Sequence, residues 1–170
     1  MAKIVDTSDE WIFSRSGIRQ RHYSHISTGD MAWLAAEQAL AAAATAADDI
    51  DLIVLGSTTP EEICPNTASY IKNKLGASKA AAFDLNSACT SWFYGLNAAT
   101  DMIRAGSINK ALVIGSERLS LAMDWKKRES CFLFGDGAGA VLIEASDHQS
   151  GLLASKISCV PDSRECLRLP

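Results

Sequence analysis

Cys89 is the side chain in this sequence best suited to covalent chemistry. It lies within residues 83–96, FDLNSACTSWFYGL, where an apolar strand-like run gives way to a helical pattern. A cysteine that begins a helix just past a strand faces backbone N–H groups and the positive end of the helix dipole. That environment favours the thiolate, which is the nucleophilic form of the side chain. Free cysteine is also among the most buried residue types, so the local pattern leaves open a small buried hydrophobe as well.

The other cysteines and the histidines form no metal-binding pattern. The residues concerned are Cys64, Cys131, Cys159, Cys166, His22, His25 and His148. No two cysteines have the C-x-x-C spacing of zinc or thioredoxin-like sites, and no histidine stands at ligand spacing from them. We therefore expect reduced thiols, no metal and no bound cofactor.

The overall composition is that of an ordinary globular protein. The 170 residues are 48% hydrophobic and 21% charged, with a net charge of −4. This length allows one domain with one sizeable core. No apolar run approaches the roughly 20 residues that a membrane span needs, and the first residues form no signal peptide. We expect a cytoplasmic protein that associates with neither a membrane nor nucleic acid.

Helical and strand-like patterns alternate along the chain. Helices are expected at 7–17, 28–44, 65–75 and 89–105, and strands at 51–56, 80–85, 110–115, 140–145 and 151–160. Thr7 is the expected cap of the first helix, with Glu10 as its capping-box partner. The alternation predicts an α/β domain over residues 1–170, with a mostly parallel sheet, helices on both faces and one helix led by Cys89.

The glycine-rich segment 135–139, GDGAG, has a composition found in phosphate-binding loops. A dinucleotide loop must follow a strand and open a helix, whereas these glycines precede the strand-like run that begins at Ala140. We therefore predict a tight turn that needs positive φ or close packing, rather than a phosphate site.

Three ordered blocks of this sequence resemble a known family. They are VDTSDEWI at 5–12 with RSGIR at 15–19 and RH at 21–22, SAC at 87–89, and FGDGAGA at 134–140. Together they resemble the N-terminal half of β-ketoacyl-acyl-carrier-protein synthase III, a condensing enzyme of the thiolase superfamily. The resemblance implies a thiolase-like half domain that lacks the family's first strand and its whole C-terminal half.

The resemblance also implies a reaction. In this family a cysteine, here Cys89, takes an acyl group, often acetyl, from coenzyme A, and its backbone N–H forms part of the oxyanion hole. Malonyl-acyl carrier protein then loses CO₂, and the resulting carbanion attacks the thioester. The reaction initiates fatty acid synthesis, and the family's members are dimers.

Five further positions match residues that bind substrate in the family. Trp11 and Arg128 match the two sides of the adenine site, and Arg15 matches a contact to the nucleotide phosphates. Phe134 matches an aromatic of the acyl pocket, and Cys64 matches a loop residue that enters the partner's acyl pocket. That residue is often aromatic, so Cys64 predicts room for a primer longer than acetyl. Without the resemblance, the residue types alone predict that Trp11 is a partly buried packing residue and Phe134 a core residue. They predict that Arg15 and Arg128 are solvated surface residues.

The sequence departs from the family in two respects. The catalytic histidine and asparagine of the family come from the C-terminal half, and none of the three histidines matches, so we expect that this chain alone does not catalyse condensation. Residues 90–92, TSW, also replace the commoner AGF, which leaves substrate choice open. The alternatives are a non-catalytic thiolase-fold subunit or remnant, and a ketoacyl synthase of a secondary pathway with a different primer.

Overall fold

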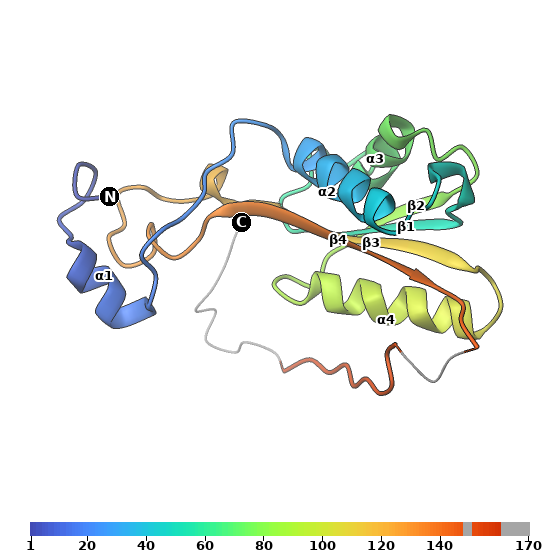
Figure 1. The fold of residues 1–170 in the computed structure, drawn as a ribbon. Helices are drawn as coiled ribbons and strands as arrows, with labels where there is room; N and C mark the ends of the chain where they lie inside the picture. The colour runs from blue at the N-terminus through green and yellow to red at the C-terminus, as the bar shows by residue number, and fades with distance from the viewer. Residues whose placement is uncertain (148–150, 161–170) are drawn as a thin grey trace.

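The computed structural model describes residues 1–147 and 151–160 and shows a mixed four-stranded sheet covered by helices on both faces (Figure 1). The strand order is β2-β1-β3-β4. Strand β1 (Leu52–Gly56) pairs in parallel with β2 (Ala81–Leu85) and β3 (Lys110–Arg118), and β4 (Asp136–Glu144) runs antiparallel to β3. The predicted α/β class with a mostly parallel sheet is confirmed.

Helices α2 (Thr28–Ala42) and α3 (Thr67–Leu75) cover one face of the sheet, and α4 (Ser91–Arg104) covers the other (Figure 1). Helix α1 (Asp9–Ser16) lies away from the sheet. Two short 3₁₀ helices, η1 (Ala47–Asp49) and η2 (Leu119–Leu121), complete the elements of the described residues. None of these helices is long and apolar enough to cross a membrane.

Strand β1 is the centre of the core, and all five of its residues are buried. Because successive side chains point to opposite faces, Ile53 and Leu55 pack towards α2 and α3, whereas Leu52 and Val54 pack towards α4. A strand buried on both faces requires an unbroken apolar run, which is the pattern that predicted it.

The glycine-rich segment 135–139 is not a turn. Strand β4 begins at Asp136, so most of the segment is extended and pairs with the end of β3. None of its glycines has positive φ, and a Cβ placed on Gly137 or Gly139 would meet nothing within 4 Å. The prediction of a turn with positive φ was wrong, because most of the segment is strand. The predicted close packing holds at Gly135, where a Cβ would lie 3.0 Å from the His22 carbonyl oxygen, whereas Gly137 and Gly139 leave open space over the sheet.

Two other predicted features are corrected. Residues 151–160 form no strand and are largely exposed, and within the described residues β4 is one edge of the sheet. The cap of α1 is Ser8, not Thr7, since Ser8 Oγ accepts the Trp11 N–H at 3.1 Å. His148 and Cys166 lie outside the described residues.

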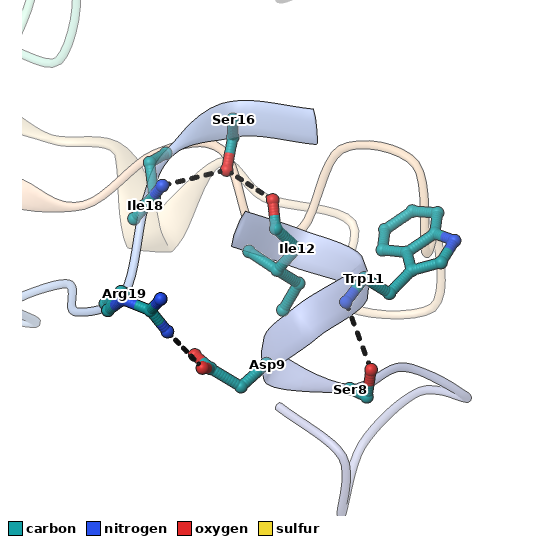
Figure 2. A network of polar contacts seen from close by, with 7 residues as sticks. All are labelled: Ser8, Asp9, Trp11, Ile12, Ser16, Ile18 and Arg19. Carbon is teal, nitrogen blue, oxygen red and sulfur yellow. Dashed lines mark hydrogen bonds and ion pairs between the residues drawn. The ribbon is translucent and has the colours of Figure 1, made fainter. Parts of the chain in front are cut away.

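Helix α1 is closed at both ends by its own polar groups (Figure 2). Gly17 ends the helix in the left-handed conformation, with φ at 70°, as the sequence predicts. Ser16 Oγ donates to the Ile12 carbonyl, and Arg19 pairs with Asp9 at 2.6 Å. The Trp11 indole projects on the side of the helix away from that ion pair.

Candidate functional site

Cys89 lies in a tight turn between β2 and α4. Helix α4 begins at Ser91, with Thr90 as its N-cap residue, so the predicted helix led by Cys89 starts two residues too early. The reason is local hydrogen bonding. Ser91 Oγ accepts the Ser87 N–H at 2.8 Å and donates to the Ala88 carbonyl at 2.6 Å, which holds residues 87–90 in the turn.

The backbone of this turn presents the thiol to solvent. Ala88 has φ at 49°, a left-handed conformation that is uncommon for a residue with a side chain. Its N–H donates to Asn86 Oδ1 at 3.0 Å, which supports that conformation. Cys89 is exposed, whereas Cys131 is buried, so a small buried hydrophobe describes Cys131 and not Cys89.

A row of glycines crosses the sheet beside Cys89. Gly56 of β1 pairs with Gly115 of β3, and Gly115 pairs with Gly139 of β4. All three lie on the face covered by α4, since Val54, Val113 and Val141 are two residues away and pack on that face. The row replaces a layer of side chains with bare backbone at the start of α4.

Gly56 and Gly115 let the start of α4 approach the sheet closely. A Cβ on Gly56 would lie 2.7 Å from the Ser91 carbonyl carbon and from the Trp92 nitrogen. A Cβ on Gly115 would lie 3.3 Å from Trp92 Cδ1. The two glycines thereby determine how close the turn that carries Cys89 lies to the sheet.

A recess of about 220 Å³ opens between this turn and the glycine row. Its lining comprises Gly56, Ala88, Cys89, Ser91, Trp92, Gly115, Ser116, Glu117, Gly137, Ala138 and Gly139. The lining contains one nucleophile, Cys89, and one ionisable carboxyl group, Glu117. This arrangement suits the attack of a sulfur nucleophile on a small electrophile held over bare backbone.

Glu117 anchors the loop that follows β1. Its carboxylate accepts hydrogen bonds from the Thr58 N–H at 2.7 Å, the Thr58 hydroxyl at 2.9 Å and the Thr59 hydroxyl at 2.6 Å. These bonds tie the end of β3 to the segment that leads to Cys64. Neither Glu117 nor the glycine row was singled out by sequence reasoning. Gly56 ends β1, whereas Gly115 and Gly139 lie inside β3 and β4, so only strand pairing shows that the three form a row.

A second cluster surrounds Trp11. The Arg15 guanidinium carbon lies 4.2 Å from the centre of the indole ring, and that of Arg128 lies 4.1 Å away. Phe132 packs edge-on against the indole with its ring centre at 5.4 Å. The structure thus brings together the three residues predicted to bind nucleotide, from segments more than a hundred positions apart. Figure 1 places α1 beyond the end of the sheet at which the parallel strands finish. Cys89 follows the end of β2 and precedes α4, so it belongs to the same end of the sheet.

The two remaining predicted residues do not line the recess at Cys89. Phe134 is half-buried just before β4, and Cys64 is exposed in the loop between β1 and α3. His22, which sequence reasoning treated as structural, accepts the Asp136 N–H through its carbonyl at 2.8 Å. It therefore joins the first motif block to the third through the backbone.

Asp136 is a structural centre that sequence reasoning missed, since its motif was interpreted as a turn. Its carboxylate accepts the Ser24 N–H at 2.8 Å, the Ser120 N–H at 2.8 Å and the Ser120 hydroxyl at 2.6 Å. Burial acts to raise the pKa of Asp136, but these hydrogen bonds and the nearby Arg118 charge together lower that pKa.

Asp136→Ala is expected to lower the free energy of unfolding by about 1–2 kcal/mol at pH 7, because it leaves three half-buried donor groups of Ser24 and Ser120 without their acceptor. Since the folded-state pKa lies below the unfolded one, the ionised carboxylate stabilises the fold above the unfolded pKa. That stability is lost as pH falls through the folded pKa, so the difference between the variants should shrink in acid. Urea unfolding at several pH values measures both effects. Asp101→Ala, at an exposed aspartate of α4, is the control, and an equal loss in both variants would contradict the role of Asp136.

Comparisons with known proteins give a consistent result. A family model described as 3-oxoacyl-[acyl-carrier-protein (ACP)] synthase III matches residues 83–161. "Beta-ketoacyl-[acyl-carrier-protein] synthase III 2" of Vibrio cholerae is 46% identical over 170 residues, which are 100% of this chain and 47% of the relative. The corresponding synthase III of Xanthomonas oryzae is 46% identical over 169 residues, which are 98% of this chain and 52% of the relative. The chain therefore spans about half the length of the curated relatives it matches.

Solved structures give the same result for the fold. A crystal structure of 3-oxoacyl-[acyl-carrier-protein] synthase III from Aquifex aeolicus has a TM-score of 0.85 and 43% identity, and the match covers 86% of this chain and 48% of that one. The priming β-ketosynthase of the R1128 polyketide biosynthetic pathway has a TM-score of 0.84 and 34% identity, over 86% of this chain and 45% of that one. The predicted resemblance and the thiolase-like fold are confirmed.

Proposed function

Because this chain is homologous to β-ketoacyl-acyl-carrier-protein synthase III along its whole length, we propose that Cys89 is the acyl acceptor of a condensing enzyme. The observation that carries the proposal is the placement of Cys89. An exposed thiol stands in the turn before α4, next to a recess whose floor is bare backbone. A plain structural cysteine needs neither the exposure nor the recess.

The proposed step is a transfer between two sulfur atoms. The Cys89 thiolate attacks the carbonyl carbon of an acyl-coenzyme A, the new carbon–sulfur bond forms, and the bond to the coenzyme A sulfur breaks. Coenzyme A leaves as its thiolate and takes up a proton from water. In the whole condensing enzyme, malonyl-acyl carrier protein then loses CO₂, and its carbanion attacks the thioester to release Cys89. No histidine or asparagine lines the recess in the described part of this chain, so we assign it the acyl transfer alone.

Trp11, Arg15 and Arg128 are the proposed contacts to coenzyme A. Indole and guanidinium planes both stack on purines, and guanidinium groups pair with phosphates. In this structure Arg128 lies directly on the indole, so a purine must separate the two groups in order to lie between them. Arg128 Nε is buried without a hydrogen-bond partner. The guanidinium does pair with the Asp6 carboxylate, but that carboxylate is fully exposed and 4.0 Å away, so this contact opposes the movement only weakly.

Arg128→Ala is expected to weaken the binding of coenzyme A by about tenfold, the loss of a partly desolvated cation–π contact. Calorimetric titration of the purified chain with coenzyme A measures the dissociation constant. Arg104→Ala, at an exposed arginine of α4, is the matched control and should leave that constant unchanged. If the unmodified chain and Arg128→Ala bound coenzyme A with equal affinity, Arg128 would not be part of the binding site.

The remaining assignments belong to the same proposal. Phe134 and Cys64 contribute to the acyl pocket, Cys64 by way of the partner in a homodimer. The protein acts in the cytoplasm, and residues 1–170 form the half of a thiolase-like domain that carries the nucleophile. The homology with synthase III supports these roles.

Intact-mass measurement after incubation with acetyl-coenzyme A tests the proposal. We expect one acetyl group per chain, which peptide mapping places on the peptide that contains Cys89. A folded sample that takes no label, or that takes it on another residue, would favour a non-catalytic thiolase-fold subunit or remnant.

A second candidate is a ketoacyl synthase of a secondary pathway that uses a different primer. The similarity to the priming β-ketosynthase of the R1128 polyketide pathway favours it, as does the TSW sequence at 90–92. Incubation with a mixture of acyl-coenzyme A thioesters distinguishes the two. Faster labelling by a longer acyl group than by acetyl supports the secondary pathway.

A further inference from the structure

We propose that Trp92 determines the length of the acyl chain carried by Cys89, because its side chain borders both the recess at Cys89 and a second, apolar recess that adjoins it. This inference rests on the proposed function, since it assumes that an acyl chain is attached to Cys89. Sequence reasoning identified Trp92 only as part of a departure from the family.

The two recesses share three lining residues. The second has a volume of about 350 Å³ and is lined by Trp92, Gly115, Gly139, Ala140 and Val141. Trp92, Gly115 and Gly139 also line the recess at Cys89, so the recesses adjoin along the glycine row and the Trp92 side chain borders both.

The position of the indole is well defined by its contacts. Its Cδ1 atom lies closest to Gly115, 3.3 Å from the place of a Cβ there. Its Nε1 donates to the Val113 carbonyl at 3.4 Å, and Phe93 packs edge-on against it with ring centres 5.2 Å apart. Gly139 lies across the strand pair from Gly115 and has open space above it.

The chemistry of the second recess fits a saturated chain. All of its lining residues are apolar, and the one ionisable carboxyl group near the glycine row, Glu117, belongs to the recess at Cys89. A short acyl group on Cys89 lies over bare glycine backbone, and a longer one meets the indole. Each methylene that enters an apolar site favours binding by about fourfold, so the indole should limit this gain to short chains.

Two substitutions should change the longest chain favoured at Cys89 in opposite directions. Trp92→Leu removes the wide indole and joins the recesses, which extends the favoured chain length. Gly139→Val fills the open space over β4 with a residue suited to strands, which shortens it. Trp33→Leu, at a tryptophan of α2 that lines neither recess, is the matched control.

The test uses N-alkyl iodoacetamides of increasing alkyl length. The cysteine sulfur displaces iodide, a thioether forms, and iodide and a proton leave. Cys159 is exposed elsewhere on the chain, so the ratio of Cys89 to Cys159 labelling cancels the intrinsic reactivity of each probe. A parallel series of acyl-coenzyme A thioesters, read by intact mass, tests the proposed function separately. Thermal unfolding shows that each variant is folded.

For the unmodified chain we expect the labelling ratio to rise with alkyl length and then to fall. In Trp92→Leu the maximum should move to longer chains, with at least about a tenfold gain for the longest probe, equivalent to roughly two more buried methylenes. In Gly139→Val it should move to shorter chains. An unchanged maximum in folded samples of both variants would overturn the inference. Failure of every acyl-coenzyme A thioester to label the unmodified chain would overturn the proposed function, whatever the alkyl series shows.

Discussion

Cys89→Ala is expected to abolish the transfer of an acetyl group from acetyl-coenzyme A to this chain. A methyl group cannot form a thioester, and the lining of the recess contains no other thiol. The loss should be complete in intact-mass spectra, whereas the thermal unfolding midpoint should change little because the thiol is exposed.

The chain provides its own controls for this experiment. Cys64 and Cys159 are also exposed, and neither lines the recess. Cys159→Ala should keep the full label if acylation depends on the turn before α4. A label that disappears with Cys159 instead of Cys89 would mean that exposure alone decides which thiol reacts.

Gly56→Ala is expected to lower the free energy of unfolding by about 1–3 kcal/mol and to displace the turn that carries Cys89. The added Cβ would lie 2.7 Å from backbone atoms of Ser91 and Trp92, and backbone atoms cannot rotate away as a flexible side chain can. The start of α4 must therefore move off the sheet. Urea unfolding measures the loss, and the rate of acetylation reports the displaced thiol.

Gly137→Ala is the matched control for this substitution. Gly137 also lies at the sheet end near Cys89, but a Cβ there meets nothing within 4 Å, and its φ is not positive. We expect a change of less than about 0.5 kcal/mol in the free energy of unfolding. Similar losses in the two variants would show that any side chain at this end is harmful, independent of contact with α4.

Together these substitutions separate two contributions to the site. Gly56 and Ser91 position the thiol, and Cys89 is the proposed source of the reacting atom. A variant that keeps the thiol but moves the turn should lose acetylation rate without losing the residue that is labelled. This distinction follows from the short contact at Gly56, which couples the packing of α4 to the position of Cys89.

Much of the fold was readable from the sequence because the signals are local. The unbroken apolar run of β1 requires burial on both faces, and Gly17 and Gly76 end helices by adopting positive φ, as both do here. The motif blocks predicted the family, and comparison confirmed the resemblance. These signals need only neighbours along the chain, so one sequence suffices to read them.

The arrangement of the site depended on contacts between distant segments, which only the tertiary structure supplies. A glycine can be needed for a turn, for a close approach of backbone or for an open surface, and the sequence does not distinguish these. In the paired strands, Gly56 allows α4 to pack closely on the sheet, whereas Gly139 leaves open space above it. Likewise, side-chain hydrogen bonds from Ser91 started α4 two residues after the thiol. Thus the sequence by itself determined which residues are proposed to carry the chemistry, and the packing of α4 on the glycine row decided where Cys89 lies.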